Sequence, residues 1–426
     1  MDPESEPRAF EEIALPAESE GVWACTESPR DSPDRFVAMS WRRIVVEPVA
    51  FDDGVAADVH TDDAVHHLWI ASPQGALTPR DDLTPWAMTL LPYVMRKQMP
   101  LHLAGAVDEV LLSNLSAVQG ILSGWYPRRM HQVEVTAERT IATVPAAGRG
   151  AFFSGGVDSF FTLSQAPSPL DAIVLVGGFD IPLEKPERTD RAAVAARKAA
   201  EEFGTTAVVI STNLRSIAEA GRSSEPVTSW GYEQHGASLA AVSYTLRATL
   251  GEVLIASSYA DQDLHPWGSH PSLDPLWSSS AQRIVHDTTA VSRVEKVAAI
   301  MRYTSAREGL RVCWMDADTY NCGVCEKCVR TRINLRATGH DGSCQTLPVL
   351  SMDEVRSLRL VDEGSRIFAE ENLRYLRGST RGDEELEIAL KKAIDRGARA
   401  GRWITRVDRI PGARRAYRFA KKFFGR

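Results

Sequence analysis

The chain has 426 residues, 44% hydrophobic and 25% charged, which is ordinary for a soluble globular protein of two or three domains. No apolar run approaches the roughly 20 residues that cross a bilayer, and the acidic start at residues 1–6 lacks the apolar core of a signal peptide, so we expect a cytoplasmic protein. Residues 396–426 carry a net charge of +10 and the rest carries −17, which predicts an acidic body with a basic tail.

The first third of the chain contains no motif that we can connect to chemistry. Residues 1–35, rich in Glu, Pro and Ser, are expected to be an irregular segment. Residues 36–148 are expected to form an α+β domain. Its strands are predicted at 41–48, 66–70 and 132–137, and its helices at 86–98 and 107–126.

From residue 149 onward, short apolar strands alternate with helices. Strands are predicted at 151–153, 172–176, 207–211 and 253–256, and helices at 157–165, 190–203 and 231–250. This alternation predicts an α/β domain with a doubly wound parallel sheet over residues 149–345. Ligands of such sheets bind at the carboxyl ends of the strands, so the loops that follow these strands should share one mouth. Residues 346–426 are expected to be a helical C-terminal region that ends in the basic tail.

A glycine-rich turn lies between the first of these strands and its helix. It consists of Ser154, Gly155, Gly156, Val157, Asp158 and Ser159. The glycines let the main chain approach a ligand closely, and the free N–H groups at a helix start, with the two serine hydroxyls, suit a phosphate or pyrophosphate. No Gly-Lys-Ser/Thr ending is present, so the turn is not a Walker A loop.

This turn resembles the PP-loop, SGGxDS, of the N-type ATP pyrophosphatases, which include asparagine, GMP and NAD synthetases, tRNA-thiolating enzymes and cyano-deazaguanine synthase. The resemblance implies a PP-loop fold of the HUP type. Members cleave ATP between the α and β phosphates and transfer AMP to a substrate oxygen, from which a nitrogen or sulfur nucleophile displaces it. The resemblance implies that residues 154–159 bind ATP with Mg²⁺ and that Asp158 and Ser159 act in catalysis.

Four of the six cysteines form a second motif, with the spacing Cys-x8-Cys-x2-Cys-x2-Cys. They are Cys313, Cys322, Cys325 and Cys328, while Cys25 and Cys344 lie outside the motif. Four thiolates on a tight knuckle fit a tetrahedral Zn²⁺ with no open position, which is typical of a structural site. An iron–sulfur cluster is the alternative.

Together the two motifs resemble the QueC family of 7-cyano-7-deazaguanine synthases over roughly residues 149–340, and the resemblance implies that the four cysteines bind zinc. That family converts a deazaguanine carboxylate, with ammonia and ATP, to an amide and then to a nitrile. The long N-terminal domain and the basic C-terminal extension depart from the family's compact pattern. We therefore expect a divergent QueC-like member with a substrate of its own.

The segment after the strand at 253–256 carries candidate substrate groups. His265, His270 and Asp274 are predicted donors or general bases, and Trp267 and Trp277 could stack on a planar substrate. The alternative is a rigid loop whose aromatic side chains fill a seam between domains.

Four positions elsewhere are secondary candidates. Asp180 is a candidate ligand of Mg²⁺ or ribose, and His235 is expected to cap a helix. Arg293 and Lys296 could reach an anionic intermediate, but the solvated face of a helix is the favoured interpretation for both.

The motifs predict an Mg·ATP-dependent ligase or synthase that adenylates a carboxylate or amide oxygen, releases pyrophosphate and replaces AMP by ammonia or an amine. The expected partners are a small carboxylate or heterocycle and an amine donor, with a protein or nucleic-acid acceptor held by the basic tail and a homodimer as further options. A tRNA- or nucleotide-modifying enzyme is one alternative. The other is a nucleotide-binding module that acts on a protein partner.

Overall fold

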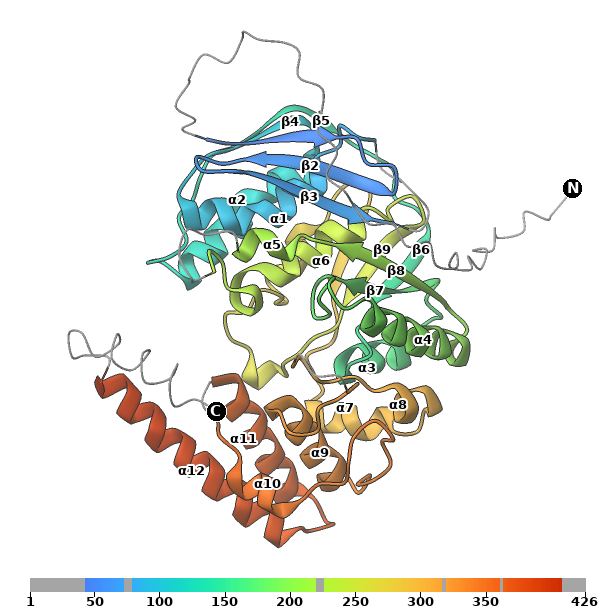
Figure 1. The fold of residues 1–426 in the computed structure, drawn as a ribbon, viewed down its shortest axis with the longest axis vertical. Helices are drawn as coiled ribbons and strands as arrows, with labels where there is room; N and C mark the ends of the chain where they lie inside the picture. The colour runs from blue at the N-terminus through green and yellow to red at the C-terminus, as the bar shows by residue number, and fades with distance from the viewer. Residues whose placement is uncertain (1–42, 73–78, 220–225, 316–318, 361–362, 408–426) are drawn as a thin grey trace, which may run out of the picture.

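The computed structural model describes residues 43–72, 79–219, 226–315, 319–360 and 363–407. The predicted irregular segment 1–35, Cys25 and residues 408–426 of the basic tail lie outside the described residues. One ten-stranded sheet in the order β10-β9-β6-β7-β8-β3-β2-β1-β4-β5 runs through the molecule (Figure 1). The α/β class is therefore confirmed.

The strands are β1 (Ile44–Val49), β2 (Gly54–His60), β3 (Val65–Ala71), β4 (Leu101–Asp108), β5 (Val135–Ile141), β6 (Gly148–Phe152), β7 (Ala172–Gly177), β8 (Thr206–Thr212), β9 (Leu250–Ile255) and β10 (Arg283–His286). The longer helices are α1 (Thr84–Lys97), α2 (Glu109–Trp125), α3 (Val157–Gln165), α4 (Pro186–Phe203), α6 (His235–Tyr244), α7 (Arg293–Ile300), α9 (Glu326–Ala337), α11 (Glu363–Gly378) and α12 (Glu384–Val407). Three short helices are α5 (Arg215–Glu219), α8 (Thr304–Gly309) and α10 (Met352–Ser357).

Strands β6 to β10 pair in parallel throughout, as predicted for this part of the chain. Alternate residues of a strand point to opposite faces of the sheet. Phe152 and Val174 accordingly join the core that contains α1 and α6, whereas Ala151 and Ile173 join a second core with α3 and α4. In the sheet, β7 and β8 lie on one side of β6, whereas β9 and β10 lie on its other side. The strand order therefore reverses between β6 and β9, which makes this position a topological switch point.

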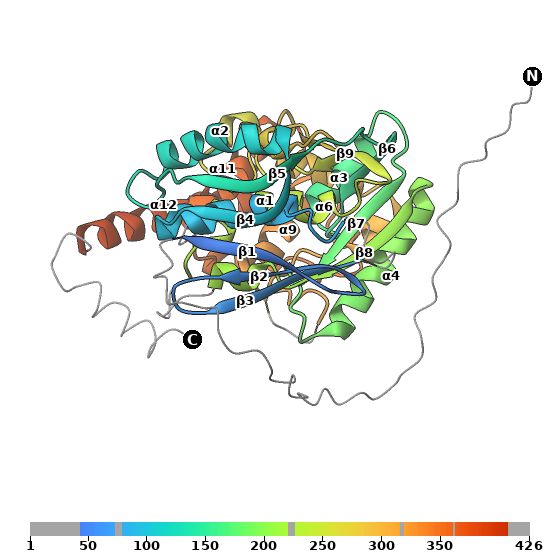
Figure 2. The same cartoon turned by 90° about the horizontal axis from the view of Figure 1, so that it is seen from above.

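Strands β1 to β5 extend the same sheet beyond β8, so the sheet is continuous across the predicted boundary at residues 148 and 149 (Figure 2). Strand β2 was not predicted, because its alanines weaken the strand signal. Strand β4 was not predicted either, and the following helix was predicted to begin at Val107. In the structure β4 extends to Asp108, whose carboxylate accepts hydrogen bonds from the backbone N–H groups of Val110 and Leu111 and so begins α2.

The joint between the two parts of the sheet is short. Strand β3 pairs with β8 only at Ile70–Thr212 and Ala71–Ser211. Asn213 continues the ladder with its side chain, because its Oδ1 accepts from the N–H of Trp69 at 2.8 Å and its Nδ2 donates to the carbonyl of His67 at 2.8 Å. The backbone N–H of Asn213 also donates to the carbonyl of Trp69 at 3.4 Å, so this residue extends the joint with both its backbone and its amide.

The helix predicted over residues 231–250 is wrong in its extent. A π-helical turn spans Trp230–Gln234, α6 covers only His235–Tyr244, and β9 already begins at Leu250. The hydroxyls of Thr245 and Thr249 donate to carbonyls three residues earlier, a local bond that competes with helix continuation.

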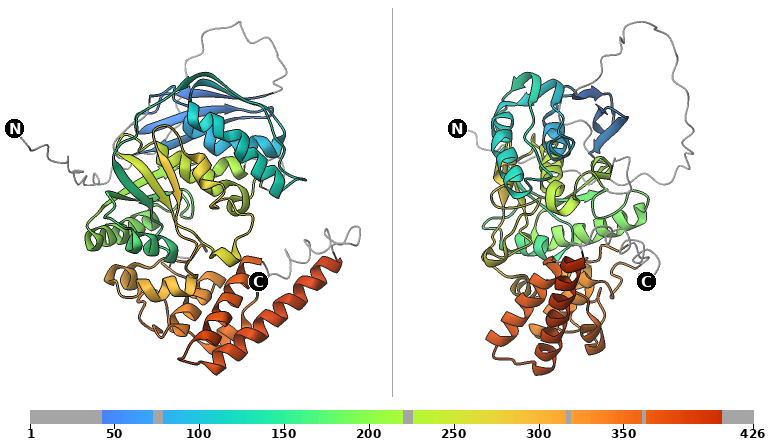
Figure 3. Two further views of the ribbon diagram at one scale, coloured as in Figure 1. Left: turned by 180° about the vertical axis from the view of Figure 1, so that it is seen from behind. Right: turned by 90° about the vertical axis from the view of Figure 1, so that its left-hand side faces the viewer.

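The helices α7 to α12 form the end of the molecule opposite β1 to β5 (Figure 3). Val294 of α7, Val329 of α9, Leu376 of α11 and Leu390 of α12 share one apolar core there. The C-terminal region is helical as predicted, as far as it is described. None of the described helices is both long and apolar enough to cross a bilayer.

We expect Asn213→Ala to lower the free energy of unfolding by about 1–2 kcal/mol, because two hydrogen bonds at the sheet joint are lost. Urea denaturation followed by circular dichroism measures the change. Asn114→Ala is the matched control, since within the described part of the chain the only hydrogen bond of that amide, to the carbonyl of Ser278, is long at 3.5 Å. Equal stability of the two variants would contradict the role assigned to Asn213.

Candidate functional site

The loop of residues 154–159 lies at the switch point, where β6 ends and α3 begins. Gly155 has a φ of +73°, a left-handed conformation that favours glycine. Gly156 precedes the first residue of α3, and no side chain caps the helix. The hydroxyl of Ser159 donates to the carbonyl of Gly156 at 3.1 Å, and that of Ser154 accepts from the N–H of Gly156 at 3.3 Å. The backbone N–H groups of this helix start thus remain for a ligand.

Cations surround the carboxylate of Asp158. Arg293 donates to it, and the ammonium of Lys296 lies 3.6 Å from its Oδ1. Lys296 also donates to the carbonyl of Ser257, just beyond β9, at 2.7 Å. One lysine therefore joins the loops that follow two parallel strands, β6 and β9. We predicted that these loops would lie together at the carboxyl edge of the sheet.

The interpretation of Arg293 and Lys296 as a solvated helix face is wrong. Their side chains are only 8% and 2% exposed, because α7 lies against α3 and the outer helices. Ser292 and Glu295 form a capping box that fixes the start of α7 and so places both cations.

Arg330 of α9 adds a third buried cation that the sequence analysis missed. Its guanidinium lies over the ring of Phe368 at 3.9 Å, and its Nε is 3.5 Å from Glu326.

The carboxylate of Asp158 is ionised. Burial raises its pKa, but the positive charges of Arg293 and Lys296 lower the pKa by a larger amount, so the net shift is downward.

Several buried polar atoms of this cationic cluster make no hydrogen bond among the described residues: Oδ1 of Asp158, Nε of Arg293 and Nε of Arg330. Two of them have only a longer ion pair, Asp158 with Lys296 at 3.6 Å and Arg330 with Glu326 at 3.5 Å. Unpaired buried polar atoms are costly, by about 1–3 kcal/mol each. The arrangement therefore suits a ligand that brings oxygen atoms to these nitrogens.

The other side of the loop also carries charge. Arg311 donates from its backbone N–H to the carbonyl of Gly155 at 2.8 Å and from Nε to that of Ser154 at 3.2 Å. Asp180, beyond the end of β7, lies in the field of Lys327 and Arg311. Desolvation raises its pKa, and these cations lower it by more, so Asp180 is ionised as well. The predicted candidate for Mg²⁺ or ribose, Asp180, thus carries a negative charge beside cations that follow the glycine loop in space.

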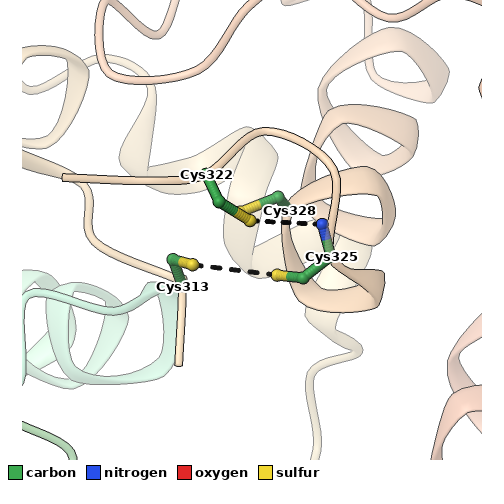
Figure 4. Close-up of side chains that lie close together, drawn as sticks. All are labelled: Cys313, Cys322, Cys325 and Cys328. Atoms are coloured by element: carbon green, nitrogen blue, oxygen red, sulfur yellow. Dashed lines mark hydrogen bonds between the residues drawn. The ribbon is translucent and has the colours of Figure 1, made fainter. Parts of the chain in front are cut away.

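The four cysteines of the second motif converge as predicted, and we call them the cysteine cluster (Figure 4). Their sulfur atoms all lie within 4.8 Å of one another, with Cys313–Cys325 and Cys322–Cys328 at 3.9 Å each. A tetrahedral site with Zn–S bonds of about 2.3 Å requires sulfur separations of about 3.8 Å. The cysteine cluster can therefore hold a metal ion such as zinc. Cys344 is buried apart from it, beside Thr346.

Asn321, which the sequence analysis did not single out, braces the cysteine cluster. Its Oδ1 accepts from the N–H groups of Val312 and Cys313 at 2.9 and 3.0 Å, and its Nδ2 donates to the carbonyl of Leu310 at 2.9 Å. Cys325 directly precedes α9, so the knuckle also sets where Lys327 and Arg330 project from the first turns of that helix.

The predicted catalytic groups of the loop after β9 separate into two sets. Asp274 is fully buried and accepts from the hydroxyl of Ser269 at 2.6 Å and from Nδ1 of His286 at 2.7 Å. His270 packs edge-on against Trp125. The contacts of Asp274 and His270 are therefore made within their own loop and with β10 and α2, as in the rigid-loop alternative.

Trp277 is only 1% exposed and belongs to the main core, so its predicted stacking on a substrate is wrong. His265 and Trp267 form the second set, since both rings pack against Tyr259. Tyr259 in turn stacks on Phe368, the ring beneath Arg330. A continuous series of ring contacts thus connects this part of the loop to the cationic cluster.

No family model matches the chain, and neither the curated proteins nor the solved structures contain a significant match. The class that the fold and site define is an α/β protein with a cationic, glycine-rich loop at the switch point of a parallel sheet and a four-cysteine cluster beside it. Its function must be inferred from this geometry.

We expect the purified protein to contain about one metal ion per chain. Cys325→Ser should remove most of this metal and lower the melting temperature, because three thiolates bind the cation more weakly than four. Elemental analysis and thermal unfolding measure both effects. Cys344→Ser serves as the control and should keep the metal. A metal-free wild-type protein as stable as the metal-loaded form would contradict the prediction.

Proposed function

We propose that the chain is an enzyme of the N-type ATP pyrophosphatase kind that adenylates a carboxylate or amide oxygen of an acceptor. The observation that carries the proposal is the set of buried cations Arg293, Lys296 and Arg330 around the uncapped helix start that follows Gly156. A polyphosphate is the ligand whose charge and oxygen atoms match this arrangement.

In the proposed complex, the N–H groups at the start of α3 and the hydroxyls of Ser154 and Ser159 hold the phosphates of ATP. Asp158 carries a negative charge and so does not bind phosphate directly. It would hold Mg²⁺, which neutralises part of the triphosphate charge when bound. Asp180 is a second carboxylate on the other flank that is available for the ion or for a ribose hydroxyl.

The proposed reaction has two steps, adenylation of the acceptor and displacement of AMP, and both take place beside the buried cations. An oxygen of the acceptor attacks the α-phosphorus, the bond from that phosphorus to the bridging oxygen breaks, and pyrophosphate leaves with the electron pair. Ammonia or an amine then attacks the activated carbon, loses a proton to the solvent, and AMP departs. Fixed cations such as Arg293 and Lys296 stabilise the charge that grows on the phosphate oxygens, and this preorganisation needs no covalent help from the protein.

We assign the metal of the cysteine cluster as structural zinc, because four thiolates leave no open coordination position for a substrate. The cluster would then act by holding Arg311 and α9 in place. An iron–sulfur cluster would instead bring iron, sulfide and visible absorbance to the purified protein, and that finding would replace this assignment.

We expect Asp158→Asn and Ser159→Ala each to reduce AMP formation at least about 100-fold, the usual effect of losing one preorganised group in phosphoryl or acyl transfer. AMP is measured by chromatography with Mg·ATP, ammonium and a panel of carboxylates that includes carboxy-deazaguanine.

Ser164→Ala, near the other end of α3, is the matched control and should retain the wild-type rate, because among the described residues its hydroxyl bonds only to Phe161 and Gln165 of the same helix. AMP formation by Asp158→Asn at the wild-type rate would refute the assignment of the loop. ATP binding without AMP under every condition would favour the nucleotide-binding module instead.

A further inference from the structure

Helix α11 of the C-terminal region lies against α7 and α9, the two helices that carry the buried cations (Figure 1). Phe368, Glu371 and Arg374 follow one another at intervals of three residues and so project from one side of α11. Phe368 contacts a cation of α9, Glu371 bonds to the start of α7, and Arg374 bonds to the loop after β9. One side of α11 is therefore joined to three segments of the candidate site.

The ring of Phe368 is a buried contact of the guanidinium groups. It is only 5% exposed, and its centroid lies 3.9 Å from Cζ of Arg330 and 5.7 Å from that of Arg293. The negative face of an aromatic ring attracts a guanidinium, and this attraction is stronger where water is excluded. The same ring stacks on Tyr259 at 5.1 Å with an angle of 18° between the planes. Phe368 thus links a cation of the site to the loop after β9.

Arg330 depends on this ring more than Arg293 does. Arg293 donates directly to the carboxylate of Asp158. Among the described residues, the only ion pair of Arg330 is the longer one with Glu326, and its Nε makes no hydrogen bond. A ring against the face of a guanidinium leaves the N–H groups in its plane available to oxygen acceptors. Arg330 is thus held in a way that keeps its donors for a ligand.

Glu371 acts on the other helix that carries cations. Its side chain is buried, and its Oε1 accepts from the backbone N–H of Val294 at 2.9 Å. Val294 lies in the first turn of α7, where N–H groups have no acceptor within the helix, so this bond stabilises the turn that carries Arg293. Arg374 donates to Asp263 at 2.7 Å and ties the loop after β9 to the same helix.

We propose that Phe368 is a positioning residue of the phosphate site, which holds the guanidinium of Arg330 so that its N–H groups bind phosphate oxygens of ATP. This inference deepens the proposed function and rests on it for the identity of the ligand. It also makes the C-terminal region part of the site, because α11 supplies both Phe368 and the cap of α7.

The test is isothermal titration of the full-length protein with inorganic pyrophosphate in a buffer that contains Mg²⁺. Phe368→Leu and Phe368→Met both remain apolar but remove the aromatic face. We expect each to bind pyrophosphate about 5-fold or more weakly than wild type, the size of a buried cation–π contact. Phe368→Tyr keeps the face and should restore binding to within about 2-fold of wild type.

Tyr375→Leu is the matched control, because Tyr375 also lies on α11 but packs against the apolar core of the C-terminal helices. It should bind pyrophosphate as wild type does. Arg330→Gln separates positioning from general packing, since Phe368 acts through Arg330. In the Arg330→Gln background, Phe368→Leu should weaken binding by less than about 2-fold. Circular dichroism establishes that each variant is folded.

Three results would overturn the proposal. The first is equal affinity of wild type, Phe368→Leu and Phe368→Met for pyrophosphate, and the second is no binding of pyrophosphate to wild type. The third is a loss of affinity in Phe368→Leu that is equalled by Tyr375→Leu or persists in full without Arg330, because the ring would then act through packing alone.

Binding is measured without turnover, so failure of this proposal is distinct from failure of the proposed function. Weaker pyrophosphate binding by Phe368→Leu, in a protein that never forms AMP, would keep the positioning role and remove the adenylation step. AMP formation by Phe368→Leu with the ATP dependence of wild type would keep the reaction and remove the role of Phe368.

Discussion

Positive charge buried at the carboxyl end of β6 is the constraint on which the rest of this structure depends. Removing an ammonium or guanidinium from water costs several kcal/mol unless partners compensate it. Lys296 is held by Asp158 and by the carbonyl of Ser257, and Arg330 by Glu326 and the ring of Phe368. The capping box of α7, the knuckle before α9 and the core around Val294 hold these cations near the start of α3, where the proposed phosphate ligand would bind.

The two motifs of the sequence are thus parts of one arrangement. The glycine loop supplies free N–H groups at a helix start, and the cysteine cluster positions cations on both of its flanks. Arg311 enters the knuckle after contacting the loop carbonyls, whereas Arg330 leaves it on α9. Under the proposed function, metal binding and phosphate binding would be coupled, because losing a metal would release the segments that carry these side chains.

Much of this site could be predicted from local sequence. The span of α3 and the convergence of the four cysteines were predicted correctly, since both depend on short-range spacing. The partners of Arg293 and the burial of Trp277 could not be predicted, because they depend on contacts between segments far apart in the chain. A helix face that meets a buried carboxylate has the same periodic pattern as one that meets water.

The central claim, that the loop cleaves ATP between its α and β phosphates, is tested most directly by identifying the products. Phosphorus NMR of Mg·ATP incubated with the protein, ammonium and an acceptor distinguishes cleavage at the α-phosphate from cleavage at the γ-phosphate. We expect AMP and pyrophosphate in equal amounts. ADP and inorganic phosphate as the products would contradict it, because the γ-phosphate rather than the α-phosphate would then be the reacting centre.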